Sequence, residues 1–222
     1  MQIRISRLHF PVTTLGPGQR IGIWFQGCSI HCPGCISADT WATNTGRTTV
    51  ESVLAHVSPW LSAADGITVT GGEPFDQPEA LAALLAALRR RTPADILVYS
   101  GYPAAQLAPD LEQAQGLIDA LISEPFELHT AHSRPLRGSD NQRLHCLTPL
   151  GRERFSQYER PLADHDKSMD VMFDGDGTVW FAGIPVRGDF QRLQQLLIDQ
   201  GHRVRISADK MRDTQTEQPG DR

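Results

Sequence analysis

Cysteine and long hydrophobic runs are both scarce in this sequence, and each shortage excludes a class of protein. Only four of the 222 residues are cysteine, which argues against a small fold held by several disulfides and favours a reducing compartment. No stretch reaches the roughly eighteen apolar residues that a membrane-spanning helix needs. Residues 1–7 also lack the features of a signal peptide. We therefore expect a cytoplasmic location and no membrane partner.

Positive charge is scarce as well. The chain has 21 lysines and arginines against 26 aspartates and glutamates, which gives a net charge of −5. Because no basic field is present to attract phosphate groups, we expect no nucleic acid partner. Hydrophobic residues make up 40% of the chain, which at this length is enough for the core of one domain with an appendage.

Three of the four cysteines form a short motif. Cys28, Cys32 and Cys35 stand directly after an apolar, strand-like run at 21–25, close enough to converge on one metal centre. A structural zinc ion nearly always takes four protein ligands. An iron–sulfur cubane usually takes four cysteines as well, so three would leave one iron open to bind a substrate or cofactor. We therefore interpret the motif as the metal ligands of a [4Fe–4S] cluster.

Two other interpretations of these cysteines remain open. A zinc ion completed by His31 or Cys146 is one, and ordinary buried thiols are the other. The neighbouring Gly27, Pro33 and Gly34 favour the cluster, because they shape a tight loop directly after a strand and such context strengthens a bare spacing.

A second motif consists of Gly71, Gly72, Glu73 and Pro74, which follow a short apolar strand at 66–70. Glycines let the backbone approach a ligand closely. Because this motif and the cysteines both follow predicted strands, they should meet at the same edge of a parallel sheet, where barrel folds carry their chemistry. The alternative is a strand-to-helix turn that uses its glycines only for geometry.

The two motifs and their flanking residues resemble the radical S-adenosylmethionine (radical SAM) superfamily. Within it, the chain is most similar to the small activating enzymes of glycyl-radical proteins, in particular those of anaerobic ribonucleotide reductase. The resemblance covers residues 3–147. It is carried by the segments 16–20, 24–28, 32–35, 39–41 and 70–75.

This resemblance implies a cofactor-based mechanism. The three cysteines would hold the cluster, and its open iron would bind S-adenosylmethionine (SAM). The segment 71–74 would hold the methionyl amino group of SAM, with Ser100 and Arg143 as further SAM-binding candidates. An external donor such as flavodoxin would supply one electron, and SAM would yield methionine and a 5′-deoxyadenosyl radical. That radical would take a hydrogen atom from a backbone glycine of a partner protein. No further catalytic residue is implied.

Some residues depart from the activating-enzyme pattern. Leu15 stands where the family has an acidic residue, and Ser123 and Glu124 replace an acidic residue and a glycine. Residues from 150 onward match nothing in the pattern. Two alternatives therefore accompany the glycyl-radical substrate. One is radical SAM modification of another peptide or small molecule, and the other is a non-catalytic metal-binding interaction module, which would have no need for the segment 71–74.

Hydrophobic periodicity predicts strands that alternate with helices, which is typical of βαβ units around a parallel sheet. We expect an α/β protein, an incomplete (β/α) barrel of the radical SAM type with a small C-terminal hairpin and helix extension. The core should span 1–148, the extension should pack on it over 149–208, and the tail at 209–222 should be disordered. Strands are predicted at 3–10, 21–25, 66–70, 96–100, 116–123, 141–147, 171–173, 178–182 and 204–206, and helices at 50–58, 78–91, 103–115 and 190–198.

Several local patterns add detail to this prediction. Thr48 with Glu51, and Asp76 with Glu79, have the spacing of capping boxes at the starts of the first two helices. The second helix carries an apolar stripe of the leucines at 81, 84, 85 and 88. We expect the strand at 3–10 to lie at the sheet edge and residues 149–169 to be irregular.

Overall fold

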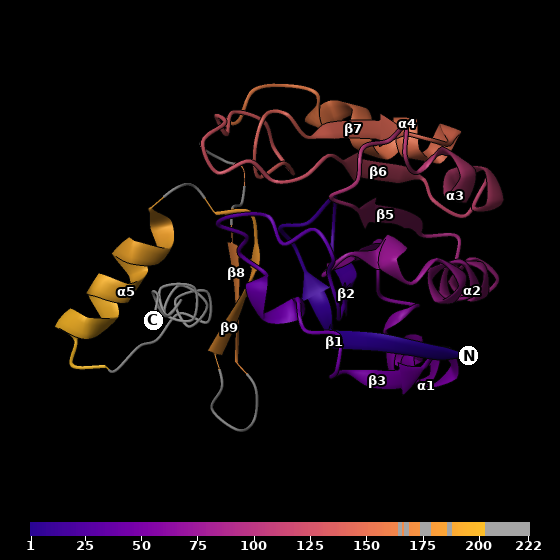
Figure 1. Ribbon diagram of the computed structural model, residues 1–222, viewed down its shortest axis with the longest axis horizontal. Coiled ribbons are helices and arrows are strands. Elements are labelled where there is room, and N and C mark those ends of the chain that lie inside the picture. Colours follow the sequence, from indigo (N-terminus) through magenta and orange to yellow (C-terminus); the bar gives the residue numbers. More distant parts are fainter. Residues whose placement is uncertain (164–165, 167–168, 174–178, 186–187, 203–222) are drawn as a thin grey trace, which may run out of the picture.

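The computed structural model describes residues 1–163, 166, 169–173, 179–185 and 188–202. Seven strands form one sheet in the order β3–β1–β2–β4–β5–β6–β7 (Figure 1). The strands are β1 (Gln2–Val12), β2 (Arg20–Phe25), β3 (Arg47–Thr49), β4 (Gly66–Gly71), β5 (Asp95–Tyr99), β6 (Ala120–Ser123) and β7 (Arg143–Cys146).

The centre of this sheet is parallel. Strands β2, β4, β5 and β6 run in the same direction, whereas β1 and β7 pair with them antiparallel at the two flanks. The strand order begins at β3 and ends at β7, so the described sheet is open rather than closed. The protein is therefore a mixed α/β protein with a mostly parallel central sheet.

Helices α1 (Val50–Val57), α2 (Pro78–Arg89) and α3 (Ala108–Gln113) cover one face of the sheet (Figure 1). The predicted leucine stripe of α2 is confirmed, because its members are at most 2% exposed. Alternate residues of the parallel strands point toward these helices, as a period of two requires. The main core contains Ile21, Ile23, Phe25, Ile67, Val69, Leu81, Leu84, Leu85, Leu88, Ile96, Val98 and Leu121.

The opposite face of the sheet is covered by C-terminal elements. Helix α4 (Pro149–Phe155) lies over β5 and β6, where Phe155 packs among Leu97 and Ile122. A hairpin of β8 (Met169–Phe173) and β9 (Val179–Gly183) lies over β1 and β2. Its residues Met172 and Ala182 are buried against Val12, Leu15 and Trp24. Each end of this face therefore has its own cover.

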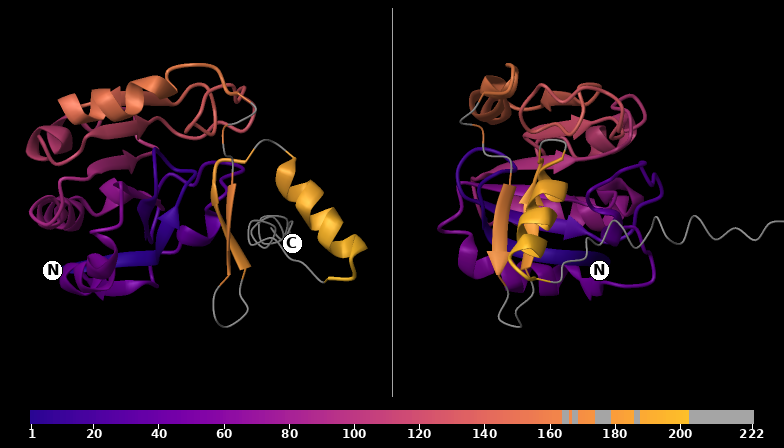
Figure 2. Two further views of the ribbon diagram at one scale, coloured as in Figure 1. Left: turned by 180° about the vertical axis from the view of Figure 1, so that it is seen from behind. Right: turned by 90° about the vertical axis from the view of Figure 1, so that its left-hand side faces the viewer.

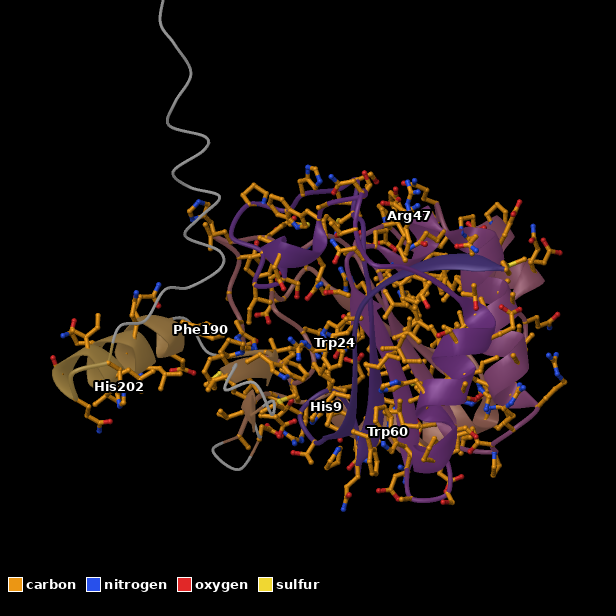
Figure 3. All side chains as sticks on the ribbon, turned by 90° about the horizontal axis from the view of Figure 1, so that it is seen from below. His9, Trp24, Arg47, Trp60, Phe190 and His202 are labelled. Carbon is orange, nitrogen blue, oxygen red and sulfur yellow. The ribbon has the colours of Figure 1, made fainter. Side chains whose placement is uncertain are left out.

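Polar and aromatic contacts attach the hairpin to the sheet. The Asp170 carboxylate accepts hydrogen bonds from the backbone N–H groups of Thr13 and Thr14, at 2.6 and 3.1 Å, and from both hydroxyls, at 2.7 and 3.0 Å. The Trp180 ring meets Trp24 edge to face, with centroids 5.4 Å apart. Figure 3 labels Trp24 at the place where the hairpin meets the sheet.

Helix α5 (Asp189–Asp199) stands beyond the hairpin and away from the sheet (Figure 2). It contains no buried residue. The Phe190 ring meets Phe181 of β9 with centroids 5.7 Å apart, whereas Leu196 and Ile198 are exposed. Among the described helices, none is long and apolar enough to cross a membrane.

A buried ion pair joins the amino ends of the parallel strands. Arg20, which begins β2, lies 2.5 Å from the carboxylate of Asp95, which begins β5, and neither side chain is exposed. The guanidinium also donates to the hydroxyl of Thr68 at 2.6 Å, and Arg154 of α4 donates to Asp95 at 3.0 Å. Buried charges persist only when their hydrogen bonds are completed in this way. The network therefore fixes β2, β4, β5 and α4 relative to one another.

Most sequence predictions of strands and helices are confirmed, with shorter bounds at 103–115 and 116–123, where the structure has α3 and β6. Strand β1 is not at the sheet edge, because β3 pairs outside it. The prediction that 149–169 is irregular is wrong at α4. The hairpin turn at 174–177, the strand at 204–206 and the tail at 209–222 lie outside the described residues.

Two predicted helix caps are wrong. Thr48 and Glu51 were expected to cap α1, but the N-cap is Thr49, whose hydroxyl accepts the N–H of Ser52 at 3.1 Å. Glu51 instead contacts the N-terminal ammonium. Asp76 was expected to begin α2, but its carboxylate turns toward the cysteine loop.

Candidate active site

The cysteine loop begins where β2 ends, at the carboxyl edge of the parallel strands. Gly27 opens it with a φ of 103°, a left-handed conformation that favours glycine. Its N–H donates to the carbonyl of Thr40 at 2.7 Å, and the N–H of Cys28 donates to Trp41 at 3.2 Å. The loop is therefore anchored by backbone hydrogen bonds at its start, before any ligand binds.

The three thiols of this loop are free and partly buried. Burial raises the pKa of each, that of Cys35 to about 11. Because thiolates are the ligands of iron and zinc, binding a metal centre would release these protons. In the described part of the chain, no group of three histidine, cysteine, aspartate or glutamate side chains is arranged to hold a metal ion. In a cubane, each of the three thiolates would bind a different iron.

The zinc alternatives fit this geometry poorly. Cys146 pairs with Ala120 at the start of β6, whereas the cysteine loop follows the end of β2. Because β2 and β6 run in the same direction within the sheet, the two lie at opposite edges, and Cys146 is no ligand for this site. His31 lies inside the loop, where its ring stacks on Trp41 with centroids 4.6 Å apart.

The Gly71–Pro74 segment lies directly against the cysteine loop. The N–H of Gly72 donates to the carbonyl of Phe25 at 2.9 Å, and the N–H of Glu73 donates to the carbonyl of Gly27 at 2.8 Å. A Cβ atom on Gly72 would lie 2.1 Å from that same Gly27 oxygen. A glycine is thus required for the two motifs to approach this closely.

Glu73 provides a buried carboxylate at the centre of the site. Its side chain accepts hydrogen bonds from the N–H of Phe75 at 3.0 Å, the hydroxyl of Ser100 at 2.9 Å and the N–H of Gly101 at 2.7 Å. The residue is 1% exposed, and this burial raises the pKa of Glu73 to about 7. Ser100, a predicted site residue, is therefore brought into direct contact with Glu73.

Arg143 lies in β7 opposite Ser123, which ends β6. It is at the same edge of the sheet as the other candidates, but its side chain is exposed, and the hydrogen bonds to the Glu73 carboxylate come from other residues. Arg137 begins the polar segment 137–143 that Arg143 ends, but unlike Arg143 it is buried, at 1% exposure, and it contacts Glu159 through Nη2. Within the described chain, its Nε and Nη1 atoms have no hydrogen-bond partner.

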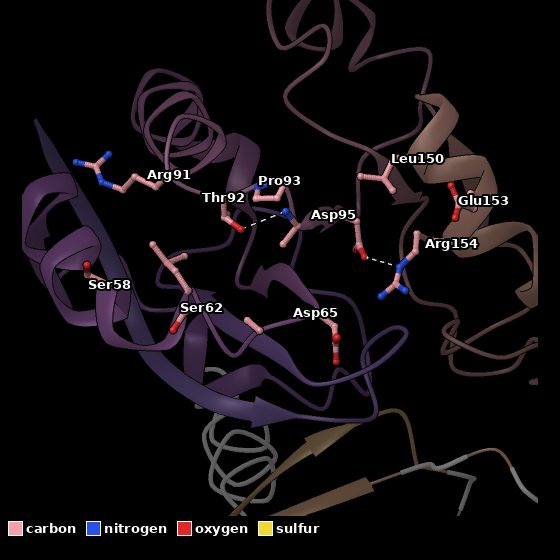
Figure 4. Close-up of a pocket in the computed structure, with 13 residues that line it drawn as sticks. Ser58, Ser62, Asp65, Arg91, Thr92, Pro93, Asp95, Leu150, Glu153 and Arg154 are labelled. Atoms are coloured by element: carbon pink, nitrogen blue, oxygen red, sulfur yellow. Dashed lines mark hydrogen bonds and ion pairs between the residues drawn. The ribbon is translucent and has the colours of Figure 1, made fainter.

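A cavity of about 850 Å³ opens at the opposite edge of the sheet (Figure 4). Asp65, which precedes β4, and Asp95, which begins β5, line it together with Leu150 and Arg154. These residues stand at the amino ends of the parallel strands. The cavity therefore lies away from the cysteine loop and forms no part of this site.

The chain is similar to several known activating proteins. An anaerobic ribonucleoside-triphosphate reductase-activating protein of Enterobacteria phage T4 is 33% identical over 138 residues, 58% of this chain and 85% of the relative. The protein with the same name from Escherichia coli (strain K12) is 30% identical over 149 residues, 63% of this chain and 96% of the relative. The pyruvate formate-lyase-activating enzyme of Listeria monocytogenes is 34% identical over 83 residues, 35% of this chain and 34% of that protein.

The cysteine loop and these relatives define a radical SAM enzyme of the activating type, an oxidoreductase whose cofactors are a [4Fe–4S] cluster and SAM. A family described as a 4Fe-4S single cluster domain matches residues 14–145. The chain belongs to that family. The crystal structure of QueE from Escherichia coli is similar over 45% of this chain and 52% of that chain, at 21% identity and a TM-score of 0.38, a likeness too slight to say more about the fold.

Proposed function

We propose that this enzyme activates a glycyl-radical protein by removing a hydrogen atom from one of its backbone glycines. The proposal is supported by the relatives, which are named as activating proteins and are matched over 85% and 96% of their length. The observation that carries it is the direct contact between the cysteine loop and the Gly71–Pro74 segment, with the Glu73 carboxylate buried beside them. When bound and reduced by one electron, the cofactors supply the 5′-deoxyadenosyl radical that takes the hydrogen.

Cys28, Cys32 and Cys35 are the proposed cluster ligands. Their partial burial limits access of water to the sulfurs, and the hydrogen-bonded start of the loop holds the first of them in place. With three protein thiolates on a cubane, one iron is left for SAM. The chain's contribution is thus to hold the three thiolates and to leave the fourth position open.

Gly71, Gly72, Glu73, Pro74 and Ser100 are the proposed binding residues for the methionyl end of SAM. A cation close to a buried carboxylate favours its charged form, so a bound ammonium group would hold Glu73 ionised near neutral pH. The Ser100 hydroxyl and the N–H of Gly101 orient that carboxylate.

Arg143 is proposed to contact the ligand from the rim of the site. Its exposed position at the carboxyl edge of the sheet suits a residue that meets SAM or the entering peptide. An arginine there presents a planar set of donors that matches a carboxylate.

The remaining expectations accompany this proposal. We assign the sheet to an incomplete (β/α) barrel of the radical SAM type, with a core predicted at 1–148 and an extension predicted at 149–208 that packs on it, whereas the predicted tail at 209–222 lies outside the described residues. The location of Phe155 in the core favours ending the core after α4 rather than before it. A cytoplasmic location and an electron donor such as flavodoxin complete the proposal.

The first test is an anaerobic assay of 5′-deoxyadenosine. The protein is reconstituted with iron and sulfide and given dithionite and SAM. We expect product from the wild type and from Cys146→Ala, but none from Cys32→Ala, because only the last removes a proposed ligand. Product from Cys32→Ala at the wild-type rate would refute the cysteine assignment.

The second test addresses the substrate. A purified glycyl-radical reductase is added to the same mixture, and its glycyl radical is sought by electron paramagnetic resonance. A doublet that requires both SAM and this enzyme would support the proposal. Formation of 5′-deoxyadenosine without the doublet would favour modification of another peptide or small molecule.

A further inference from the structure

Three loops of the site meet at the carboxylate of Asp76. The first is the cysteine loop after β2, which contributes Ser29. The second follows β4 and contains Asp76 itself, and the third follows β5 and contributes Tyr102. Asp76 thus connects the proposed cluster ligands with the loop that carries Ser100.

The contacts use both oxygens of the carboxylate. Oδ2 accepts the backbone N–H of Ser29 at 2.7 Å. Oδ1 accepts the hydroxyl of Ser29 at 2.9 Å and the hydroxyl of Tyr102 at 2.7 Å. The two hydroxyl oxygens are themselves 2.8 Å apart. Hydrogen bonds to an ionised acceptor are about twice as strong as neutral ones, so this small network holds Ser29 through both its backbone N–H and its hydroxyl.

Ser29 is the residue directly after Cys28, within the interval that separates the first two proposed ligands. The next residue, Ile30, packs closely over Gly101, where a Cβ atom would lie 2.7 Å from its Cδ1. Two neighbouring residues of the cysteine loop are therefore held against the loop after β5, one by charge and one by packing.

Helix capping does not account for Asp76. Its carboxylate contacts no N–H group of α2, and the N-cap position belongs to Gln77, which makes no side-chain cap. The hydrogen bonds of the Asp76 side chain within the described residues go to the cysteine loop and to Tyr102. The fold of α2 thus leaves this acid free to serve the site.

We propose that Asp76 is a positioning residue that fixes the segment between Cys28 and Cys32 against the loop after β5, so that the cluster side and the SAM side of the site are held as one unit. The role rests on the proposed function, since it takes these cysteines as ligands. It also places a fixed negative charge next to Cys28. A fixed negative charge opposes the addition of an electron to a nearby cluster.

The first experiment measures how fast the reconstituted holoprotein loses iron to a chelator, followed by cluster absorbance. We expect Tyr102→Phe, which removes one charge-assisted hydrogen bond, to lose iron about tenfold faster. Asp76→Ala removes three such hydrogen bonds and should lose iron faster still. In the double variant, the acceleration of iron loss should be smaller than the product of the two single accelerations, because the two residues share one network. Glu79→Gln, which removes an exposed carboxylate on α2, is the matched control and should behave as wild type.

The second experiment measures the reduction potential of the cluster. Asp76→Asn removes the charge with little change of shape, so at one fixed poise we expect the ratio of reduced to oxidised cluster to rise about tenfold, or 59 mV. Tyr102→Phe and Glu79→Gln should leave that ratio unchanged. If Asp76 had a purely structural role, Asp76→Asn and Tyr102→Phe would not differ in this ratio.

The outcomes distinguish this role from the proposed function. Wild-type iron release by Asp76→Ala and Tyr102→Phe, or effects that simply multiply in the double variant, would overturn the positioning role while the enzyme still cleaves SAM. A wild-type protein that assembles no cluster would refute the proposed function and this role together. Because Tyr102→Phe removes a single oxygen, it keeps the test decisive if Asp76→Ala melts at a much lower temperature.

Discussion

Glu73 is the residue whose chemistry depends most on its surroundings. Three donors surround its carboxylate, yet burial outweighs them and raises the pKa of Glu73 from 4.5 to about 7. The folded protein thus binds this proton more tightly than the unfolded chain does. Between those two pKa values the unfolded state loses its proton first, so the free energy of unfolding contributed by Glu73 falls as the pH rises.

We predict a measurable pH dependence from this one group. From pH 4.5 to 7, the free energy of unfolding of the cluster-free wild type should fall by about 3 kcal/mol more than that of Glu73→Gln. Below that range the Glu73 contribution is fully present, and above pH 7 it is lost. Urea unfolding of both proteins across the range measures the difference. Parallel curves for the two proteins would show that Glu73 titrates normally.

Some site residues are predictable from the sequence and others are not. The spacing of the three cysteines and the Gly-Gly-Glu-Pro segment indicate ligands because close sequence neighbours share one loop. Asp76 gives no such signal, since its partners Ser29 and Tyr102 are 47 and 26 residues away and its local pattern looks like a helix cap. Likewise, nothing in the sequence distinguishes buried Arg137 from exposed Arg143.

At the scale of elements, the turns after β4 and β5 depend on two different kinds of glycine contact. A Cβ on Gly72 would lie 2.1 Å from the backbone oxygen of Gly27, which cannot move without shifting the cysteine loop. A Cβ on Gly101 would lie 2.7 Å from the end of the Ile30 side chain, which can rotate away. Neither glycine has a left-handed φ, so space alone decides the cost of a side chain.

We therefore predict that Gly72→Ala lowers the free energy of unfolding by about 1–3 kcal/mol, as overpacking against rigid neighbours does. Gly101→Ala should cost clearly less. Urea unfolding of the two variants gives the comparison, and the same variants can be assayed for 5′-deoxyadenosine. Equal destabilisation would mean that the Ile30 side chain is as rigid as the backbone.

Helices and strands are predictable from the sequence where one of their faces is clearly apolar. Helix α2 shows its leucine stripe, and the central strands are short apolar runs between turns. Helix α4 was missed because it is brief and arginine-rich, and it is held by Phe155 packing and the ion pair of Arg154 with Asp95. Tertiary contacts of this kind override a weak local pattern.

At the scale of the whole molecule, Asp170 attaches the hairpin to the turn after β1. The region that matches the family ends at residue 145, so the hairpin lies outside that region. It covers the face of the sheet that carries Trp24. We predict that Asp170→Ala raises the hydrogen-exchange rates of β8 and β9 amides by about tenfold or more, because four hydrogen bonds to one carboxylate are lost.

Amides of β4 should keep their wild-type exchange rates in that variant, since β4 pairs with β2 and β5 rather than with the hairpin. Asp199→Ala, which removes a carboxylate from exposed α5, is the matched control. Faster exchange throughout the sheet would instead make Asp170 part of the global folding unit.

The attachment of the hairpin also has a consequence for synthesis. Thr13 and Asp170 are 157 residues apart, and a ribosome that adds about 5–20 residues per second needs roughly 8–30 seconds to travel between them. Throughout that interval Val12 and Trp24, which are among the first hydrophobic residues to emerge, have no hairpin to cover them. The oldest part of the nascent chain is thus the last to be completed, and a ribosome that stops early releases a sheet with one apolar face open.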